Sequence, residues 1–240
     1  MNTNNYIYND GICKMNYENK IDGIKLLKNI KDEVITTAFF DPQYRGILDK
    51  MNYGNEGKER GKARCDLQQM DETTIKSFIT ELNRVVKPSG HLFLWVDKFH
   101  LCTGVLDWFV NTDFQLVDMI TWDKDKIGMG YRTRRKSEYL IIFQKEPIRA
   151  KDVWLLHNIP DVWKEKVVKT HAHSKPIELQ KQLILSTTKP GDVVCDPCSG
   201  GYSVFNACKA VNRDFIGGDI KFGKEVNEDE AANINTDILK

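Results

Sequence analysis

Residues 192–201, Asp-Val-Val-Cys-Asp-Pro-Cys-Ser-Gly-Gly, indicate the fold class of this 240-residue chain. An apolar stretch ends at Asp196, a turn of proline and small residues follows, and an amphipathic helix is predicted over residues 203–211. This order is typical of a ligand-binding corner in an α/β sheet, because the N–H groups of the turn and of the helix start favour negative groups. The turn has neither the G-x-G-x-x-G spacing of a dinucleotide site nor the G-K-[ST] of a phosphate loop.

The same alternation of short apolar strands and amphipathic helices extends over most of the chain. It predicts an α/β fold with a mostly parallel sheet, and the length fits a single domain. The strands around the basic loop at 123–137 are expected to pair as an antiparallel hairpin. The predicted strands are 34–40, 91–96, 114–122, 138–144, 192–196 and 214–219, and the predicted helices are 23–30, 71–87, 104–111, 176–188 and 203–211.

A second polar motif, Asp41-Pro42-Gln43-Tyr44, directly follows the strand predicted over 34–40. Ligands bind at the carboxyl ends of strands in open α/β sheets, so an acid, a rigid turn and an aromatic ring at this place suit a catalytic site. An Asp-Pro turn with a packing tyrosine is the structural alternative. Asp219 ends the strand after the one that carries Asp196, where an acid can accept hydrogen bonds from ribose hydroxyls.

Composition excludes several classes of protein. The chain is 41% hydrophobic, and no apolar run reaches the roughly 18 residues that a membrane helix needs. Its six cysteines show no paired spacing, and its first residues do not resemble a signal peptide. We therefore expect a cytoplasmic protein without a membrane partner.

The formal net charge of +1 conceals two basic clusters. One contains Lys58, Arg60, Lys62 and Arg64, and the other contains Arg132, Arg134, Arg135 and Lys136. Such clusters are either nucleic-acid contacts or solvated loops.

Cysteine and histidine spacing does not favour a metal site. Cys195 and Cys198 form a C-x-x-C pair without a second such pair, and no carboxylate at a suitable spacing completes a site with His171 and His173. We expect no bound metal.

Taken together, these segments resemble the β-class, permuted S-adenosylmethionine-dependent DNA amino-methyltransferases. Residues 41–44 resemble their D-P-P-Y catalytic motif, and residues 196–200 resemble the start of their D-P-F-x-G-S-G cofactor motif. The catalytic motif precedes the cofactor motif, which is the order that defines the class. Further similar segments are residues 171–176 (H-P-x-x-K-P in the family), residues 120–124 and 128–132 beside the target-base pocket, and Asp22, 19 residues before Asp41.

Three positions depart from the family pattern. Gln43 stands where the family has a second proline, which makes the catalytic loop less rigid. Cys198 replaces an aromatic residue that packs on the cofactor's adenine, and residues 201–203 replace S-G-T. These departures bear on cofactor affinity more than on the fold.

The resemblance implies a Rossmann-like methyltransferase fold in one domain, residues 1–240, with a mostly parallel twisted sheet, an antiparallel hairpin at one edge, and DNA-contacting insertions at about 45–70 and 146–170. It implies methyl transfer from S-adenosylmethionine to N6 of adenine after base flipping. Aspartate at the first motif position goes with adenine more often than with cytosine. N4-cytosine methylation and a catalytically inactive DNA-binding subunit remain open alternatives. The implied partner is double-stranded DNA, with a homodimer and a cognate restriction endonuclease as further candidates.

The resemblance also implies which residues act. The carboxylate of Asp41 and the carbonyl of Pro42 would accept hydrogen bonds from the target amino group, and Tyr44 would stack on the base. The implied cofactor residues are Asp22, Phe40, Asp41, Lys175, Asp196, Pro197, Cys198, Ser199, Gly200 and Asp219. The implied DNA contacts are Arg132, Arg134, Arg135, Lys136, Lys58 and Arg60.

Overall fold

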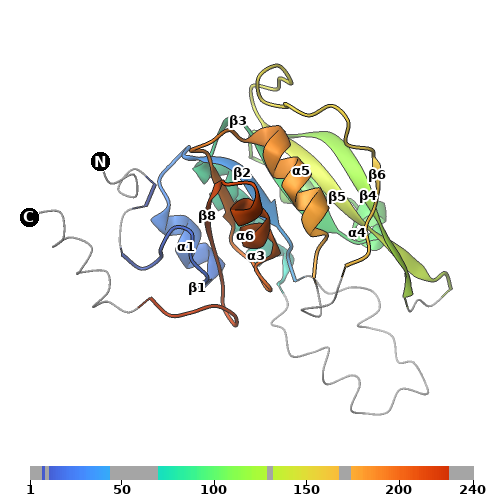
Figure 1. Ribbon diagram of the computed structural model, residues 1–240, viewed down its shortest axis with the longest axis horizontal. Coiled ribbons are helices and arrows are strands. Elements are labelled where there is room, and N and C mark those ends of the chain that lie inside the picture. Colours follow the sequence, from blue (N-terminus) through green and yellow to red (C-terminus); the bar gives the residue numbers. More distant parts are fainter. Residues whose placement is uncertain (1–6, 9–10, 44–69, 129–131, 168–173, 227–240) are drawn as a thin grey trace, which may run out of the picture.

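A computed structural model describes residues 7–8, 11–43, 70–128, 132–167 and 174–226 (Figure 1). The predictions for Tyr44, Lys58, Arg60, His171 and His173 lie outside these ranges.

The fold is built on an eight-stranded sheet of order β1-β8-β7-β2-β3-β5-β4-β6. The first five strands in that order are mutually parallel, β5 is antiparallel to both β3 and β4, and β6 is parallel to β4. This confirms the α/β prediction. The strands are β1 (Asn19–Lys20), β2 (Ile35–Phe40), β3 (Val86–Val96), β4 (Phe114–Gly128), β5 (Arg135–Lys145), β6 (Val162–Lys164), β7 (Val193–Asp196) and β8 (Asp214–Asp219).

Helices cover both faces of the sheet and create two apolar layers (Figure 1). The first layer lies between the sheet and α1, α3 and the 3-10 helix η3, and the second lies between the sheet and α5 and α6. All six residues of β2 are buried, as expected for a central parallel strand that is covered on both faces. The helices are α1 (Gly23–Asn29), α3 (Glu72–Val85), α4 (Lys98–Thr103), η3 (Leu106–Trp108), α5 (Ile177–Thr187) and α6 (Ser203–Ala210).

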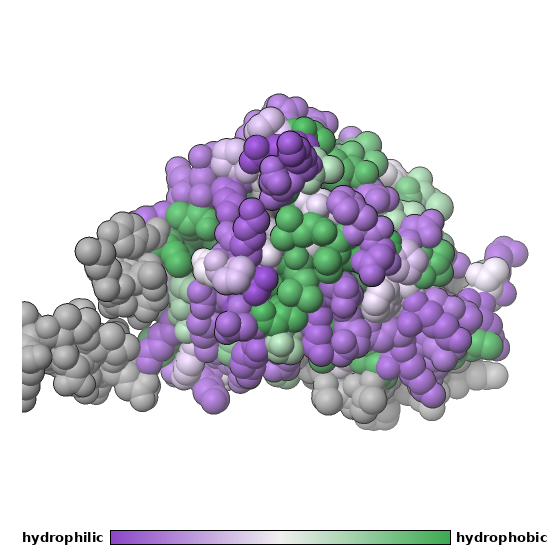
Figure 2. Space-filling model, turned by 45° about the horizontal axis from the view of Figure 1, so that its top comes forward, coloured by the Kyte–Doolittle hydropathy of each residue, from purple (hydrophilic) through white to green (hydrophobic). Residues whose placement is uncertain are grey.

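Local chemistry explains where helices begin. The Asp71 carboxylate accepts the N–H of Thr74 and caps α3, and Asp22 caps α1 through the N–H of Lys25. Hydrophilic residues dominate the face shown in Figure 2, and hydrophobic residues gather in a central patch on it. No helix within the described ranges is long and apolar enough to cross a membrane.

Three predicted elements differ from the structure. The helix predicted over 71–87 ends at Val85, and β3 begins at once, with a register shift against β2 that takes up Pro88, Ser89 and Gly90. The helix predicted over 104–111 is wrong. Asp97 instead caps α4 by accepting the N–H groups of Phe99 and His100, and η3 follows Gly104. The β4–β5 hairpin is not the outermost part of the sheet, because the unpredicted strand β6 pairs outside β4.

Candidate active site

Each of the five parallel strands leads into an aspartate within two residues of its end. These aspartates are Asp22 after β1, Asp41 after β2, Asp97 after β3, Asp196 at the end of β7 and Asp219 at the end of β8. Because the strands are parallel, all five residues lie at one edge of the sheet. Asp41 and Asp196 are far apart in sequence but follow directly paired strands, with Thr37 opposite Val194.

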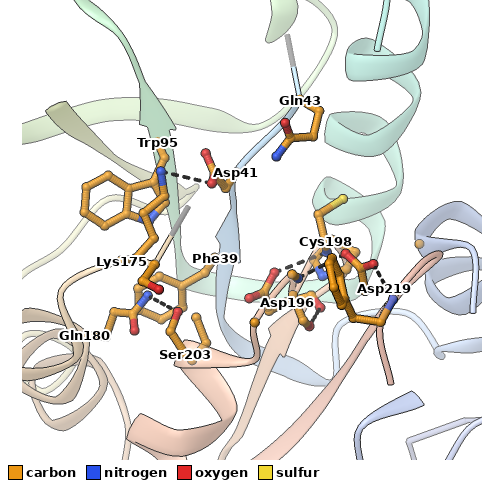
Figure 3. Close-up of a pocket in the computed structure, with 18 of the residues that line it drawn as sticks. Phe39, Asp41, Gln43, Trp95, Lys175, Gln180, Asp196, Cys198, Ser203 and Asp219 are labelled. Atoms are coloured by element: carbon orange, nitrogen blue, oxygen red, sulfur yellow. Dashed lines mark hydrogen bonds and ion pairs between the residues drawn. The ribbon is translucent and has the colours of Figure 1, made fainter. Parts of the chain in front are cut away.

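Four of these five aspartates line one cavity of about 770 Å³, a size suited to a cofactor-sized ligand (Figure 3). Asp97 is the exception, because its carboxylate caps α4 and contacts His100. The structure therefore brings the 41–43 segment and the 196–200 turn into a single cleft. The cavity-lining residues from the predicted cofactor set are Asp22, Asp41, Lys175, Asp196, Pro197, Cys198, Ser199, Gly200 and Asp219.

The predicted cofactor residue Phe40 does not line this cavity, whereas Phe39 does. Phe40 is fully buried in the other apolar layer and stacks on Phe78, with ring centroids 5.1 Å apart. Successive side chains of a strand point to opposite faces, so only one of the two phenylalanines can face the ligand. Pro42 is also buried.

Asp41 is held by an ion pair that sequence reasoning did not predict. Its carboxylate lies 3.0 Å from the Nζ atom of Lys175, just before α5, and the same Nζ lies 2.9 Å from the carboxylate of Glu138 in β5. Glu138 also pairs with Lys124 of β4. The Lys175 ammonium lies 4.9 Å from the centroid of the Trp95 ring. Lys175 was expected to hold the cofactor, but its ammonium is directed to two carboxylates.

These pairings decide the charge states of both partners. Burial alone would raise the pKa of Glu138, but the ammonium groups of Lys175 and Lys124 lower it to about 2. Burial alone would lower the pKa of Lys175, but Asp41 and Glu138 hold it above its ordinary value. Both groups are therefore charged at neutral pH.

Asp196 is in the opposite situation. Burial, together with the nearby charges of Asp41 and Asp219, raises its pKa to about 8, against the lowering effects of a hydrogen bond from the N–H of Cys198 and of the Lys175 ammonium. No ion pair to Asp196 exists among the residues that the structure describes. At neutral pH Asp196 is therefore mostly protonated, and a ligand cation at this place would favour its ionised form.

Asp219 and Asp22 shape the rest of the cavity. The Asp219 carboxylate accepts the N–H groups of Gly200, Lys221 and Phe222 at 2.8–3.0 Å, which fixes the turns after β7 and β8. A Cβ atom on Gly23, next to Asp22, would lie 2.3 Å from the carbonyl oxygen of Pro197. Only glycine therefore allows α1 to start so close to this turn.

Gln180 of α5 adds a polar group that the sequence did not single out. It lines the cavity, is 1% exposed, and donates from Nε2 to the Ser203 hydroxyl at 3.1 Å. Its Oε1 atom has no hydrogen-bond partner among the described residues. A buried acceptor without a donor is costly, and a ligand N–H group would satisfy it.

The predicted DNA contacts of the second basic cluster flank the turn of the β4–β5 hairpin. Arg132, Arg134 and Lys136 are exposed, and Lys136 pairs with Asp123 at 3.0 Å. Arg135 differs, because its guanidinium lies over the Phe99 ring and 3.7 Å from Asp97. Arg135 is thus turned inward and is the weakest candidate for a phosphate contact.

The described part of the expected insertion at 146–170 packs largely against the second apolar layer. Trp154, Ile159, Trp163 and Val167 contact that layer, and Val167 also lines the cavity. No group of three or more potential metal ligands gathers within the described ranges.

Comparisons with known proteins agree with this geometry. Residues 35–225 match the family model described as DNA methylase, of the N6/N4 type. The Type II methyltransferase M.HhaII of Haemophilus parahaemolyticus is 60% identical, over 94% of this chain and 100% of its own length. The Type II methyltransferase M2.MboI of Moraxella bovis is 24% identical, over 81% of this chain and 79% of its own length.

Solved structures share the fold. The PvuII DNA methyltransferase (cytosine-N4-specific) has a TM-score of 0.66 at 16% identity, with 95% of each chain covered. The complex of M1.HpyAVI with S-adenosylmethionine has a TM-score of 0.60 at 18% identity, covering 86% of this chain and 94% of the other.

Proposed function

The chain belongs to the DNA methylase family of the N6/N4 type, and from this premise we propose that it transfers the methyl group of S-adenosylmethionine to the N6 amino group of adenine in double-stranded DNA. The observation that carries the proposal is the shared cavity, in which Asp41 lies at the end of β2 beside the acid-lined corner of β7 and β8. Aspartate at the first position of the D-P-P-Y-like motif favours adenine over cytosine.

The cavity fits the proposed cofactor. S-adenosylmethionine, when bound, supplies a methyl group on a positively charged sulfur and carries an ammonium group. Asp196 would ionise beside a bound cation, and the Oε1 of Gln180, which has no partner among the described residues, suits the ammonium N–H groups. Asp219 and Asp22 would accept hydrogen bonds from the ribose hydroxyls, since both line the cavity and a carboxylate has more lone pairs than their backbone hydrogen bonds use.

Asp41 has the central part in the proposed reaction. The exocyclic nitrogen of adenine is a weak nucleophile, because its lone pair is delocalised into the ring. The Asp41 carboxylate and the Pro42 carbonyl would accept hydrogen bonds from the two N–H groups of the adenine amino group. These hydrogen bonds would orient the nitrogen lone pair toward the methyl carbon. Such orientation can supply roughly 7–11 kcal/mol of the barrier. The anion of Asp41 also stabilises the positive charge that develops on the nitrogen.

We propose that Arg132, Arg134 and Lys136, exposed around the hairpin turn, contact the DNA backbone. Lys58, Arg60, the segments 45–70 and 146–170, and the stacking of Tyr44 on the flipped base remain predictions of the family resemblance. The curated relatives are Type II methyltransferases, so a restriction endonuclease of the same specificity is the partner we propose. A homodimer also remains a prediction.

The test is direct. The protein is incubated with unmethylated DNA and labelled S-adenosylmethionine, the DNA is digested to nucleosides, and the modified base is identified. We expect N6-methyladenine, and the Asp41→Ala variant serves as the control. N4-methylcytosine would establish the cytosine alternative, and absence of S-adenosylmethionine binding by titration calorimetry would establish the inactive subunit.

A further inference from the structure

Lys175 creates an electrostatic problem for the proposed chemistry. Its ammonium lies 3.0 Å from the Asp41 carboxylate, so the two groups alone form a neutral pair. A neutral pair stabilises the positive charge on the attacking nitrogen much less than a free anion does.

Glu138 adds a second carboxylate to this pair. Its Oε2 atom lies 2.9 Å from the same Lys175 Nζ, so the carboxylates of Glu138 and Asp41 approach within about 6 Å of each other across one ammonium. Asp41, Lys175 and Glu138 together carry a formal charge of −1, and Lys124, which pairs with the other oxygen of Glu138, brings the four-residue cluster to neutrality. The side chains of Asp41, Lys175 and Glu138 are 12% to 27% exposed, so solvent screens their charges only partly.

The fold holds Glu138 firmly in this position. Glu138 lies in β5 opposite Trp122 of β4, and its second oxygen pairs with Lys124, whose ammonium lies over the Trp122 ring. The low pKa of Glu138 agrees with an ionised carboxylate at every working pH. The methyl-transfer centre is thereby tied to the hairpin whose turn carries the exposed basic residues.

We propose that Glu138 is a positioning residue that offsets the charge of Lys175, so that the cluster around Asp41 presents no net positive charge to the target nitrogen. The inference rests on the proposed methyl transfer. Lys175 fixes the orientation of Asp41, and Glu138 keeps the Lys175 ammonium from cancelling the Asp41 charge.

Charge compensation makes a prediction that a merely structural role does not. The Glu138→Gln variant keeps the shape but leaves the Asp41 carboxylate with the two ammonium groups of Lys175 and Lys124, so the cluster becomes net positive. We therefore expect the single-turnover methylation rate to fall about 10-fold to 100-fold. The affinity for S-adenosylmethionine should stay within about threefold of the wild type. Removing Lys175 as well, in Lys175→Met with Glu138→Gln, frees the Asp41 charge and should recover at least about fivefold of the loss.

The matched control is Asp118→Asn, which removes an exposed carboxylate from strand β4 of the same hairpin, where its Oδ1 accepts the N–H of Met119. We expect its single-turnover rate to equal that of the wild type. A double variant no faster than Glu138→Gln, or an equal loss in Asp118→Asn, would overturn the proposal. A wild-type protein that methylates no DNA would instead contradict the proposed function itself.

A folding defect does not leave the question open. If thermal unfolding shows that Glu138→Gln is not folded, the double variant alone provides the test. Proteins often tolerate replacement of both members of a buried ion pair. A rate within about tenfold of the wild type supports charge compensation. A rate as low as that of Asp41→Ala contradicts it.

Discussion

Asp41 and Asp196 occupy equivalent places in the fold but have opposite surroundings. Each follows a central parallel strand, and the two strands are neighbours. Asp41 has an ammonium 3.0 Å away, whereas Asp196 has no paired cation among the described residues and a pKa raised to about 8 by burial. The parallel strands therefore place the acids, and Lys175, which precedes α5, determines which acid is already paired. The paired acid serves the substrate base in our proposal, and the unpaired acid serves the cationic cofactor.

The largest effect should follow from removing the paired acid. We expect Asp41→Ala to lower the single-turnover methylation rate by at least about 100-fold, because the orienting acceptor and the stabilising anion are both lost. Binding of S-adenosylmethionine, measured by calorimetry, should remain within a few-fold of the wild type. A loss of cofactor affinity as large as the loss of rate would contradict the proposal that Asp41 serves the base and Asp196 serves the cofactor.

Removing the unpaired acid should stabilise the free protein at alkaline pH. The folded pKa of Asp196, about 8, exceeds its ordinary value of 3.8, so its contribution to stability is complete below about pH 4 and is lost as the pH rises toward 8. Asp196→Asn lacks this loss. We expect the stability difference between Asp196→Asn and the wild type, measured as the free energy of unfolding, to be on the order of 4 kcal/mol larger at pH 8.5 than at pH 5. Denaturant unfolding at the two pH values measures this difference, and equal curves would show that Asp196 is not an uncompensated charge.

Binding of the cofactor should ionise Asp196. From pH 6 to pH 7 we expect the affinity for S-adenosylmethionine to rise by up to about tenfold, because the cation favours the carboxylate over the carboxylic acid. Calorimetry in two buffers of different ionisation enthalpy should find up to about one more proton released by the wild type than by Asp196→Asn. Identical proton release in the two proteins would argue that the cation binds elsewhere.

The smallest effect concerns the acceptor on α5. Gln180→Leu removes Oε1 and should weaken S-adenosylmethionine about fivefold, in the range of one buried hydrogen bond. The affinity for 5′-methylthioadenosine, which lacks the amino-acid part, should not change. If both ligands weaken alike, Gln180 supports the packing of α5 on Ser203 and does not contact the ammonium.

Much of this arrangement could be predicted from the sequence, because local patterns mark the ends of strands. Asp41, Asp196 and Asp219 each stand where an apolar stretch ends, and parallel strands bring such ends to one edge. The confirmed β8, residues 214–219, shows how clearly an apolar stretch between turns marks a strand. The family resemblance then joined these separate acids into one site.

The rest of the candidate site could not be predicted, because it depends on pairing and packing that a local sequence pattern does not contain. Residues 35–40 are buried on both faces, so no alternation indicated whether Phe39 or Phe40 meets the ligand. Glu138 and Lys124 become partners only through the register of β4 and β5, and a shift of one residue would turn them to opposite faces. Gln180 became visible only once its unpaired oxygen was known.

The join between Gln43 and Met70 has a consequence for engineering this protein. The N–H of Met70 donates to the carbonyl of Gln43 at 2.7 Å, so the chain departs from the catalytic corner and re-enters it at a single point. Closing a connection over an already fixed gap costs little more as its length grows, about 0.6 kcal/mol for each doubling. Residues 45–69 could thus be exchanged as a cassette for a stretch of another length and sequence, with Tyr44 retained. Such grafts would test whether this stretch contributes to DNA recognition, as the family resemblance implies.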